Sequence, residues 1–232
     1  MAGTLCYGAS QPLPLAMSFF LLAFPALFSI VNPLGGAFIF LSATERFHPS
    51  LRSHLARWVA IYSFILISAS FYVGAYVLTF FGISVPVLRV AGGIVIALAA
   101  WRMLNRDDTK ADPETPSTEL PAGDTLNRMA FYPLTMPLTT GPGTISVVVS
   151  LGTSRPSTFG EGQLWFFVQM MLATALLCAI IYLMYRYADQ ISRFIGATGT
   201  SVIMRLSAFL LFCIGIQIFW NGAAELLGAL PS

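Results

Sequence analysis

The chain has 232 residues, of which 12 are basic and 10 are acidic, so charged side chains make up only 9% of it. Ordinary soluble domains carry roughly 25% charged residues. Here 56% of the residues are hydrophobic and the mean hydropathy is +0.77. This composition excludes a soluble globular domain, a disordered chain and a nucleic-acid-binding protein with a basic face. It predicts an all-α integral membrane protein.

Apolar runs long enough to cross a bilayer recur along the chain, since a spanning helix needs about 20 mostly apolar residues. The segment 104–127 between the third and fourth runs is polar, contains eight charges and is expected to be a solvated linker. We therefore expect one repeat of three helices over 1–103 and a second over 128–232. The six runs cover about 16–43, 58–81, 84–103, 129–151, 163–185 and 201–224.

The basic residues predict the orientation of these spans. Nine of the twelve lie in the loops after the first, third and fifth runs, Arg155 alone lies on the opposite side, and Arg89 and Arg205 fall inside runs. Basic loops stay in the cytoplasm, so the linker is expected to be cytoplasmic and both termini periplasmic. The first 45 residues contain no Lys or Arg. A cleavable signal peptide needs a basic start, so the first run is expected to remain as a transmembrane helix.

Each half of the chain begins with a span that is interrupted near its middle by proline and glycine. The interruptions are Asn32-Pro33-Leu34-Gly35-Gly36 and Gly141-Pro142-Gly143. Because each half has three spans, the two halves run in opposite directions, and the sequence predicts six transmembrane helices in two inverted-topology repeats, the first helix of each broken at mid-membrane. Matched interruptions of this kind point to a transport site. An ordinary helix kink is the alternative, since proline and glycine are common in membrane helices.

The side chains around the two interruptions are neutral hydrogen-bonding groups. Helix N-termini attract a carboxylate, and free carbonyls at helix C-termini suit an ammonium group or a sodium ion. A site with many dipoles and no fixed charge favours a small zwitterion or a neutral polar solute. The hydroxyl groups, Thr135 and Ser146 included, could instead bond to carbonyls of their own helices, whereas Asn32 is costlier to bury. The candidate substrate-binding residues are Asn32, Pro33, Gly35, Gly36, Thr139, Thr140, Gly141, Pro142, Gly143 and Thr144.

Two arginines inside the spans are candidate gating residues. Twelve residues separate Arg89 from Arg102, and the corresponding helix length of about 18 Å is short of a hydrocarbon core of about 30 Å. In an inverted repeat Arg89 lies toward the outside and Arg205 toward the cytoplasm, with Glu225 and Glu45 as the respective partners at the same depth. Snorkelling to lipid phosphates is the alternative, and it is stronger for Arg205.

Three segments together resemble the MarC family of bacterial inner-membrane proteins. They are VNPLGG at 31–36, FGISVPVLRVAGG at 81–93 and PLTMPLTTGPGTI at 133–145. The resemblance implies six helices in two inverted repeats, and transport of small neutral amino acids in at least some members. This chain has Thr139, Thr140 and Thr144 where the family often has small apolar residues, and Ala208 where glycine is common. These departures concern the substrate and not the fold.

The expected function is therefore a secondary transporter, exporting or exchanging small neutral amino acids across the bacterial inner membrane. A drug-efflux protein or a channel of the same architecture is the alternative. An enzyme is not expected, because the sequence has no HExxH, no GxSxG and no paired intramembrane carboxylates. Cys6, Cys178 and Cys213 have no metal-binding spacing, and no cofactor or metal is expected. Coupling to Na+ or H+ stays open, the expected partners are the amino acid and membrane lipid, and a homo-oligomer is possible.

Overall fold

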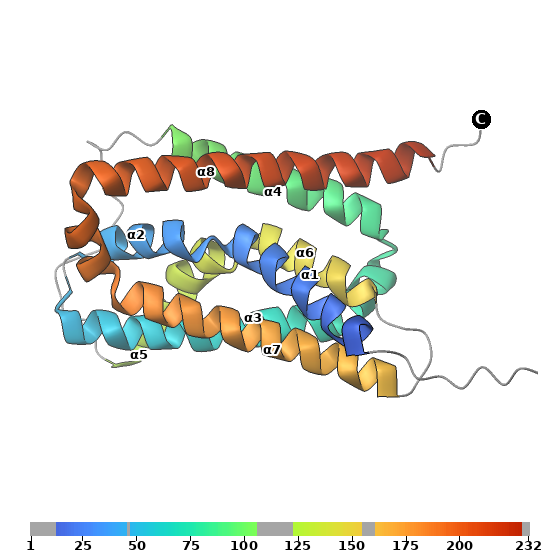
Figure 1. Cartoon of the computed structure of the whole chain (residues 1–232), viewed down its shortest axis with the longest axis horizontal. Coiled ribbons are helices and arrows are strands. Elements are labelled where there is room, and N and C mark those ends of the chain that lie inside the picture. The colour runs from blue at the N-terminus through green and yellow to red at the C-terminus, as the bar shows by residue number, and fades with distance from the viewer. Residues whose placement is uncertain (1–12, 46, 106–122, 155–160, 229–232) are drawn as a thin grey trace, which may run out of the picture.

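A computed structural model describes residues 13–45, 47–105, 123–154 and 161–228, and every element in these ranges is helical (Figure 1). Several residues on which the sequence-based predictions rest lie outside the described ranges. They are Cys6, Arg46, Arg106, Lys110 and Arg155, together with most of the expected linker 104–127.

The described residues of the first half form four helices. Helix α1 (Leu13–Val31) is followed after one residue by α2 (Pro33–Ala43), and these two helices form the first interrupted span. Helix α3 (Pro49–Phe81) returns through the bundle and ends at Gly82, whose φ of 66° suits glycine. Helix α4 (Val85–Leu104) completes this half.

The second half repeats the pattern with more irregular backbone. The short α5 (Gly123–Met129) leads into the π-helical segment η1 (Ala130–Thr139), and α6 (Pro142–Thr153) continues the interrupted span. Helices α7 (Glu161–Arg186) and α8 (Ala188–Gly228) follow, and α8 bends at Gly196, where φ is 78°.

The described helices are long and apolar enough for a multi-pass membrane protein. Five can cross a membrane by length and composition, counting 19–43 as one span across its break. The count reaches six if the pair 126–139 and 142–153, bent by 69°, forms one span. Many large apolar side chains point away from the bundle, and Phe80 is 84% exposed. This is the surface expected of helices that contact lipid.

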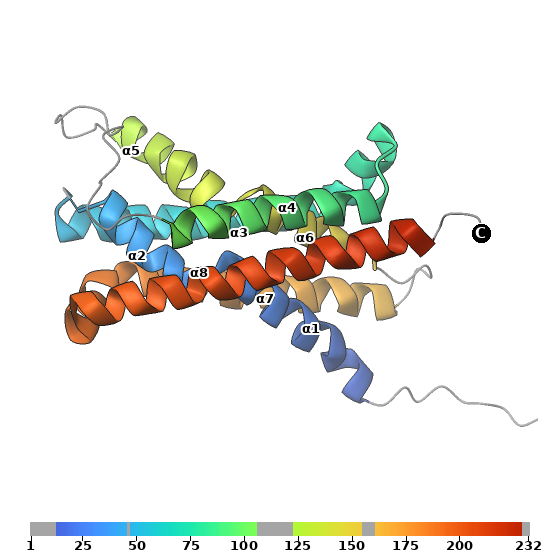
Figure 2. The ribbon, with the colours of Figure 1, turned by 90° about the horizontal axis from the view of Figure 1, so that it is seen from above.

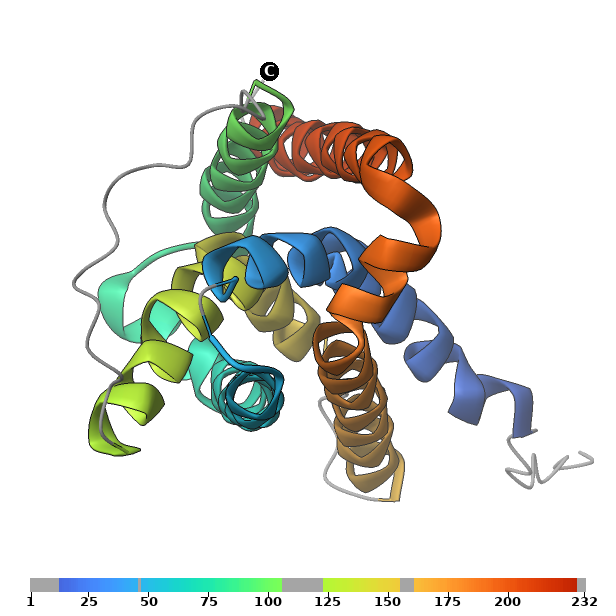
Figure 3. The ribbon, with the colours of Figure 1, turned by 90° about the vertical axis from the view of Figure 1, so that its left-hand side faces the viewer.

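The two interrupted spans run antiparallel through the middle of the bundle. Helix α1 lies beside α6 and α2 beside η1, an arrangement visible in two views (Figures 1 and 2). Seen from one end, they lie between the α4–α8 pair on one side and helices α3 and α7 on the other (Figure 3). The breaks are therefore enclosed by the remaining helices.

Glycines allow the last helices of the two halves to pack closely. A Cβ atom on Gly93 of α4 would lie 2.7 Å from the carbonyl oxygen of Gly215 in α8, and one on Gly222 would lie 2.7 Å from the carbonyl oxygen of Pro86. The backbones can approach only because these side chains are absent. The Gly92–Gly93 pair thus serves contacts within the chain, because Gly92 lies against Ser146 of α6.

Two helices extend beyond the apolar runs that predicted them. Helix α3 begins at Pro49, so the segment that contains His54 is helical and continues the span out of the apolar region. The His54 ring accepts a hydrogen bond from Trp58 Nε1 at 3.0 Å, one turn away. Helix α5 begins at Gly123, inside the segment expected to be linker. Hydropathy marks only the part of a helix that crosses hydrocarbon, and polar turns at its ends escape it.

Candidate functional site

The first break is a single residue, Asn32. It has a left-handed backbone with φ 47° and ψ 64°, a conformation that asparagine tolerates better than most residues. Its N–H donates to the carbonyl of Phe28 at 2.9 Å, and its Oδ1 accepts from the Gly35 N–H at 3.2 Å. Pro33 then opens α2 with no N–H to satisfy. Asn32 thus ends one helix and caps the next.

The second break is wider and has no side-chain cap. Thr140 (φ −119°, ψ 77°) and the extended Gly141 (φ −82°, ψ 176°) are both non-helical, and Pro142 is the first residue of α6. The Thr140 N–H donates to the Thr135 carbonyl at 2.8 Å, which ends η1. The N–H groups of the first turn of a helix have no acceptor within that helix. In α6 this turn includes the buried Gly143. The second break therefore has backbone N–H groups that can donate hydrogen bonds to a bound anion.

Tyr185 near the end of α7 connects the two breaks. Its side chain is 2% exposed, and its hydroxyl lies 2.9 Å from Thr139 Oγ1 beside the second break. On the other side a Cβ atom on Gly36 would lie 2.6 Å from the same hydroxyl, and the ring stacks on Phe40 with centroids 4.7 Å apart. One buried phenol therefore contacts both interrupted spans.

The hydroxyl groups near the breaks fall into two classes. Thr135 and Thr139 donate to the carbonyls of Ala130 and Leu134 at 2.6 and 2.7 Å, and Ser146 donates to the Gly143 carbonyl at 2.8 Å. By contrast, Thr140 Oγ1 and Asn32 Nδ2 are buried and have no hydrogen-bond partner within the described residues. Buried polar groups normally find a partner, so these two atoms are free to bond to a polar ligand.

The ten candidate residues differ in burial. Asn32 and Gly141 are half-buried, and Pro142 is exposed. Gly35 is needed beside Asn32, since a Cβ atom there would lie 2.6 Å from Nδ2, and Gly143 gives room to Ile96 of α4. The buried members are Pro33, Gly35, Gly36, Thr139, Thr140, Gly143 and Thr144.

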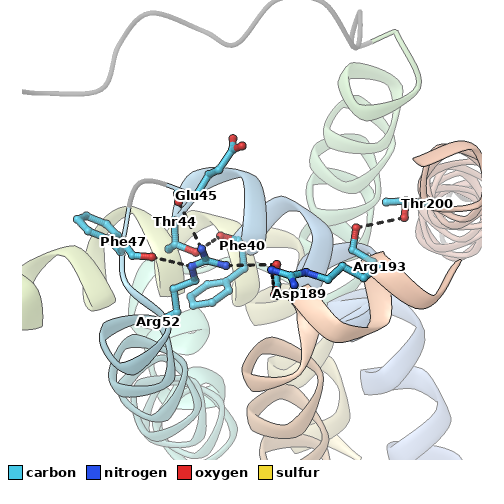
Figure 4. Close-up of polar contacts among 9 residues, drawn as sticks. Phe40, Thr44, Glu45, Phe47, Arg52, Asp189, Arg193 and Thr200 are labelled. Atoms are coloured by element: carbon cyan, nitrogen blue, oxygen red, sulfur yellow. Dashed lines mark hydrogen bonds and ion pairs between the residues drawn. The ribbon is translucent and has the colours of Figure 1, made fainter. Parts of the chain in front are cut away.

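Arg89 joins three helices at the end of the bundle where α4 begins. Its guanidinium pairs with the Glu225 carboxylate in α8, the partner expected from depth, and its Nε donates to Ser150 Oγ of α6 at 2.9 Å. Arg205 is exposed on α8. Glu45 offers its backbone carbonyl to Arg52 at 3.4 Å, and its carboxylate points away from that residue (Figure 4). The gating roles of these residues stay predictions.

A second arginine cluster lies at the opposite end of the bundle. Arg52 Nε donates to the Phe47 carbonyl at 2.9 Å, and Arg52 Nη1 lies 3.8 Å from Asp189 at the start of α8 (Figure 4). Asp189 also pairs with Arg193 at 3.0 Å. The cluster connects the end of α2 and the start of α3 to the corner between α7 and α8.

Sequence reasoning missed both Tyr185 and the Arg52 cluster. Tyr185 lies in an apolar run, and nothing in its neighbours distinguishes it from the aromatic residues that face lipid. Arg52 enters the topology prediction only as one of the nine basic loop residues. Its position between two spans is a signal that it could hold them together. Within the described residues, no group of three or more His, Cys, Asp or Glu side chains could hold a metal ion.

Comparisons with known proteins agree with these features. A family model described as "MarC family integral membrane protein" matches residues 17–227. The UPF0056 inner membrane protein MarC of Escherichia coli (strain K12) is 34% identical over 206 residues, covering 87% of this chain and 92% of that protein. The protein of the same name from Shigella flexneri has the same identity and coverage. No solved structure matches the chain significantly. The chain belongs to the MarC family of integral membrane proteins.

Proposed function

We propose that this protein is a secondary transporter that exports or exchanges small neutral amino acids across the bacterial inner membrane. The membrane is taken from relatives that are named inner membrane proteins. The cargo is inferred from the two breaks, whose ten candidate residues are all uncharged. Helix N-termini bind a carboxylate and helix C-terminal carbonyls bind an ammonium group, and an amino acid carries both groups on one small molecule.

The observation that carries the proposal is the meeting of both breaks at Tyr185, beside two unpartnered buried atoms. Tyr185 lies against Gly36 and bonds to Thr139, and the next residue, Thr140, has the free hydroxyl. The uncapped start of α6 is the preferred place for the substrate carboxylate, because its N–H groups and helix dipole favour an anion. The Asn32 amide and the Thr140 hydroxyl supply further hydrogen bonds.

The pattern of helix contacts supports two inverted repeats. The interrupted span of the first half, α1 with α2, contacts α7 and α8 of the second half. The interrupted span of the second half, η1 with α6, contacts α3 and α4 of the first. The middle helices α3 and α7 pair, as do the last helices α4 and α8. This is the exchange of contacts that a pseudo-two-fold axis in the membrane plane produces, with a substrate site between the repeats. With the basic loops in the cytoplasm, both termini of such a structure are periplasmic.

Alternating access needs a closure on each side of the site. At one end Arg89 ties α4 to α6 and α8, and at the other Arg52 ties α3 to α8. We propose that these contacts, together with Arg205 and Glu45, open and close in turn. Arg89→Gln should change the ratio of uptake to export rates, whereas the exposed Arg128→Gln on α5 should not. Unchanged kinetics in Arg89→Gln would remove Arg89 from the gate.

The deciding experiment is counterflow in proteoliposomes. Vesicles are loaded with unlabelled glycine, alanine or serine, and uptake of the labelled amino acid is measured with and without a sodium or proton gradient. Saturable, stereoselective counterflow supports the proposal, and the gradient that drives it identifies the coupling ion. Ohmic conductance, or drug transport without amino-acid counterflow, would assign the same architecture to a channel or a drug-efflux protein. Crosslinking in the same vesicles reports on a homo-oligomer.

A further inference from the structure

An apolar groove lies on the outside of the bundle, away from the two breaks. It runs between α3 and α7 and has a volume of about 530 Å³. Ala175 and Ala179 of α7 leave the space, and Ile61 and Phe64 of α3 line the facing wall. Ile61 is 37% exposed, so the groove opens toward the surroundings of the protein and not toward the proposed substrate path.

One end of the groove is basic. Arg57 belongs to its lining, together with Tyr182 from α7. Arg186, one turn further along α7, donates from Nη1 to the Tyr182 hydroxyl, and its guanidinium carbon lies 5.7 Å from the centre of the Tyr182 ring. Within the described residues, neither Arg57 nor Arg186 forms an ion pair with a carboxylate. Arg57 therefore lines one end of the otherwise apolar groove, and Arg186 lies just beyond it, on the Tyr182 side chain.

The dimensions of the groove fit one leaflet of a bilayer. From Arg57 to Phe64 the α3 axis advances about 10 Å, and one leaflet of the hydrocarbon core is about 15 Å deep. Arg57 lies inside α3 directly before the apolar run 58–81, and Arg186 is the last residue of α7, so both lie at the end of the bundle that carries the basic loops. A phosphate in the headgroup region would lie at this level, and an acyl chain would extend from it along Phe64 and Ala175.

We propose that this groove binds an anionic phospholipid, with the phosphate held by Arg57 and Arg186 and one acyl chain lying between α3 and α7. An apolar groove beside two guanidinium groups that have no carboxylate partner complements such a lipid in shape and charge. Basic pockets between transmembrane helices are known to bind anionic headgroups. The proposal does not depend on the transported solute. It predicts a lipid that holds α3 and α7 together on their outer face.

Native mass spectrometry of the purified full-length protein tests the headgroup. The protein is offered equal amounts of dioleoyl-phosphatidylglycerol and dioleoyl-phosphatidylcholine, which share their acyl chains. We expect bound phosphatidylglycerol to exceed phosphatidylcholine by about fivefold for each arginine that contacts the phosphate. The double variant Arg57→Gln, Arg186→Gln should bind the two lipids equally. The matched control Arg102→Gln, Arg128→Gln removes two exposed arginines from other helices and should keep the preference.

A groove-filling variant tests the acyl chain. Ala179 is exposed, so Ala179→Leu fills the groove without entering the core, and it should reduce the adducts of both lipids. Equal loss of preference in the two double variants would overturn the headgroup site. Unchanged adducts in Ala179→Leu would overturn the acyl-chain site. If the groove-filling variant kept its lipid adducts but lost a dimer that the wild type forms, the groove would instead be a contact with a second copy of the chain.

Discussion

The two interrupted spans solve the same problem in different ways. At the first break one residue, Asn32, adopts a left-handed backbone and its own Oδ1 caps α2. At the second break two non-helical residues, Thr140 and Gly141, separate the helices, and α6 begins without a side-chain cap. The first break satisfies most of its own backbone groups, whereas the second leaves donors that only a ligand or water can satisfy.

This difference indicates that related halves need not share a role. The Gly35 N–H, one of the donors that an anion would use at the first break, is already occupied by Asn32 Oδ1. At the second break the Thr140 hydroxyl is fully buried and unpartnered. The first break therefore acts mainly as a fixed bend, and the second offers the stronger anion-binding position. Tyr185 contacts both, so the difference between them can be tested by changing one break at a time.

The largest effect is expected from Gly36→Ala. The added Cβ atom would lie 2.6 Å from the Tyr185 hydroxyl, whose ring is fixed by stacking on Phe40. Overpacking of this kind costs about 1–3 kcal/mol, and about 1.4 kcal/mol corresponds to a factor of ten. We expect amino-acid exchange in proteoliposomes to fall about tenfold or more, because the displaced Tyr185 no longer bonds to Thr139 at the second break.

Gly162→Ala is the matched control for this variant. A Cβ atom on Gly162 meets no atom within 4 Å, so only the general effect of replacing glycine in a helix remains. Normal exchange in both variants would mean that Tyr185 does not couple the breaks.

Thr140→Val addresses the second break alone. It replaces an unpartnered buried hydroxyl by a methyl group of the same shape, so the free protein should not lose stability. If the hydroxyl bonds to the substrate, the KM for exchange should rise about five- to tenfold. Thr135→Val removes a hydroxyl that already donates to Ala130. It should lower thermal stability and leave the KM unchanged, and the opposite outcome would exchange the roles of the two threonines.

Tyr185→Phe removes only the hydroxyl and keeps the stacking on Phe40. The lost hydrogen bond to Thr139 is worth about 1 kcal/mol, so exchange should fall about fivefold and thermal unfolding in detergent should shift down by a few degrees. Tyr72→Phe, in an exposed residue of α3, serves as the control. An effect on stability without one on exchange would make Tyr185 a packing residue and separate the two breaks functionally.

Most helices of this fold could be predicted from the sequence, because membrane-spanning helices are recognisable by their long apolar runs. Five of the six predicted spans correspond to helices long and apolar enough to cross a membrane, and the sixth does so if the bent pair 126–139 and 142–153 is one span. Pro33 and Pro142 each mark where a helix restarts, since proline is favoured where a helix begins. The contact between Arg89 and Glu225 followed from depth alone. None of these inferences needed tertiary information.

The candidate site was less predictable, because it depends on which groups meet. Sequence pattern alone does not distinguish the candidate residues Thr139 and Thr140, yet Thr139 donates to Leu134 and Thr140 lacks a partner among the described residues. A threonine hydroxyl can bond to its own helix or to a ligand, and the choice depends on whether a carbonyl is in reach. Tyr185 comes from α7, far from both breaks in the sequence, and only the packing of α7 against α2 brings it there.

The smallest effect is expected from Asn32→Gly, and its comparison with Asn32→Ala separates the two structural tasks of Asn32. Asn32→Gly keeps the left-handed backbone, which glycine adopts freely, and loses only the cap on the Gly35 N–H, so it should cost a few tenths of a kcal/mol. Asn32→Ala loses the cap and also places a Cβ atom in a left-handed conformation, which adds about 1–2 kcal/mol. Thermal unfolding should therefore rank the wild type first, glycine next and alanine last. If Asn32 Nδ2 also binds the substrate, both variants raise the KM alike, despite their different stabilities. If the KM follows stability instead, the first break contributes a bend and no ligand contact, and substrate binding belongs to the second break.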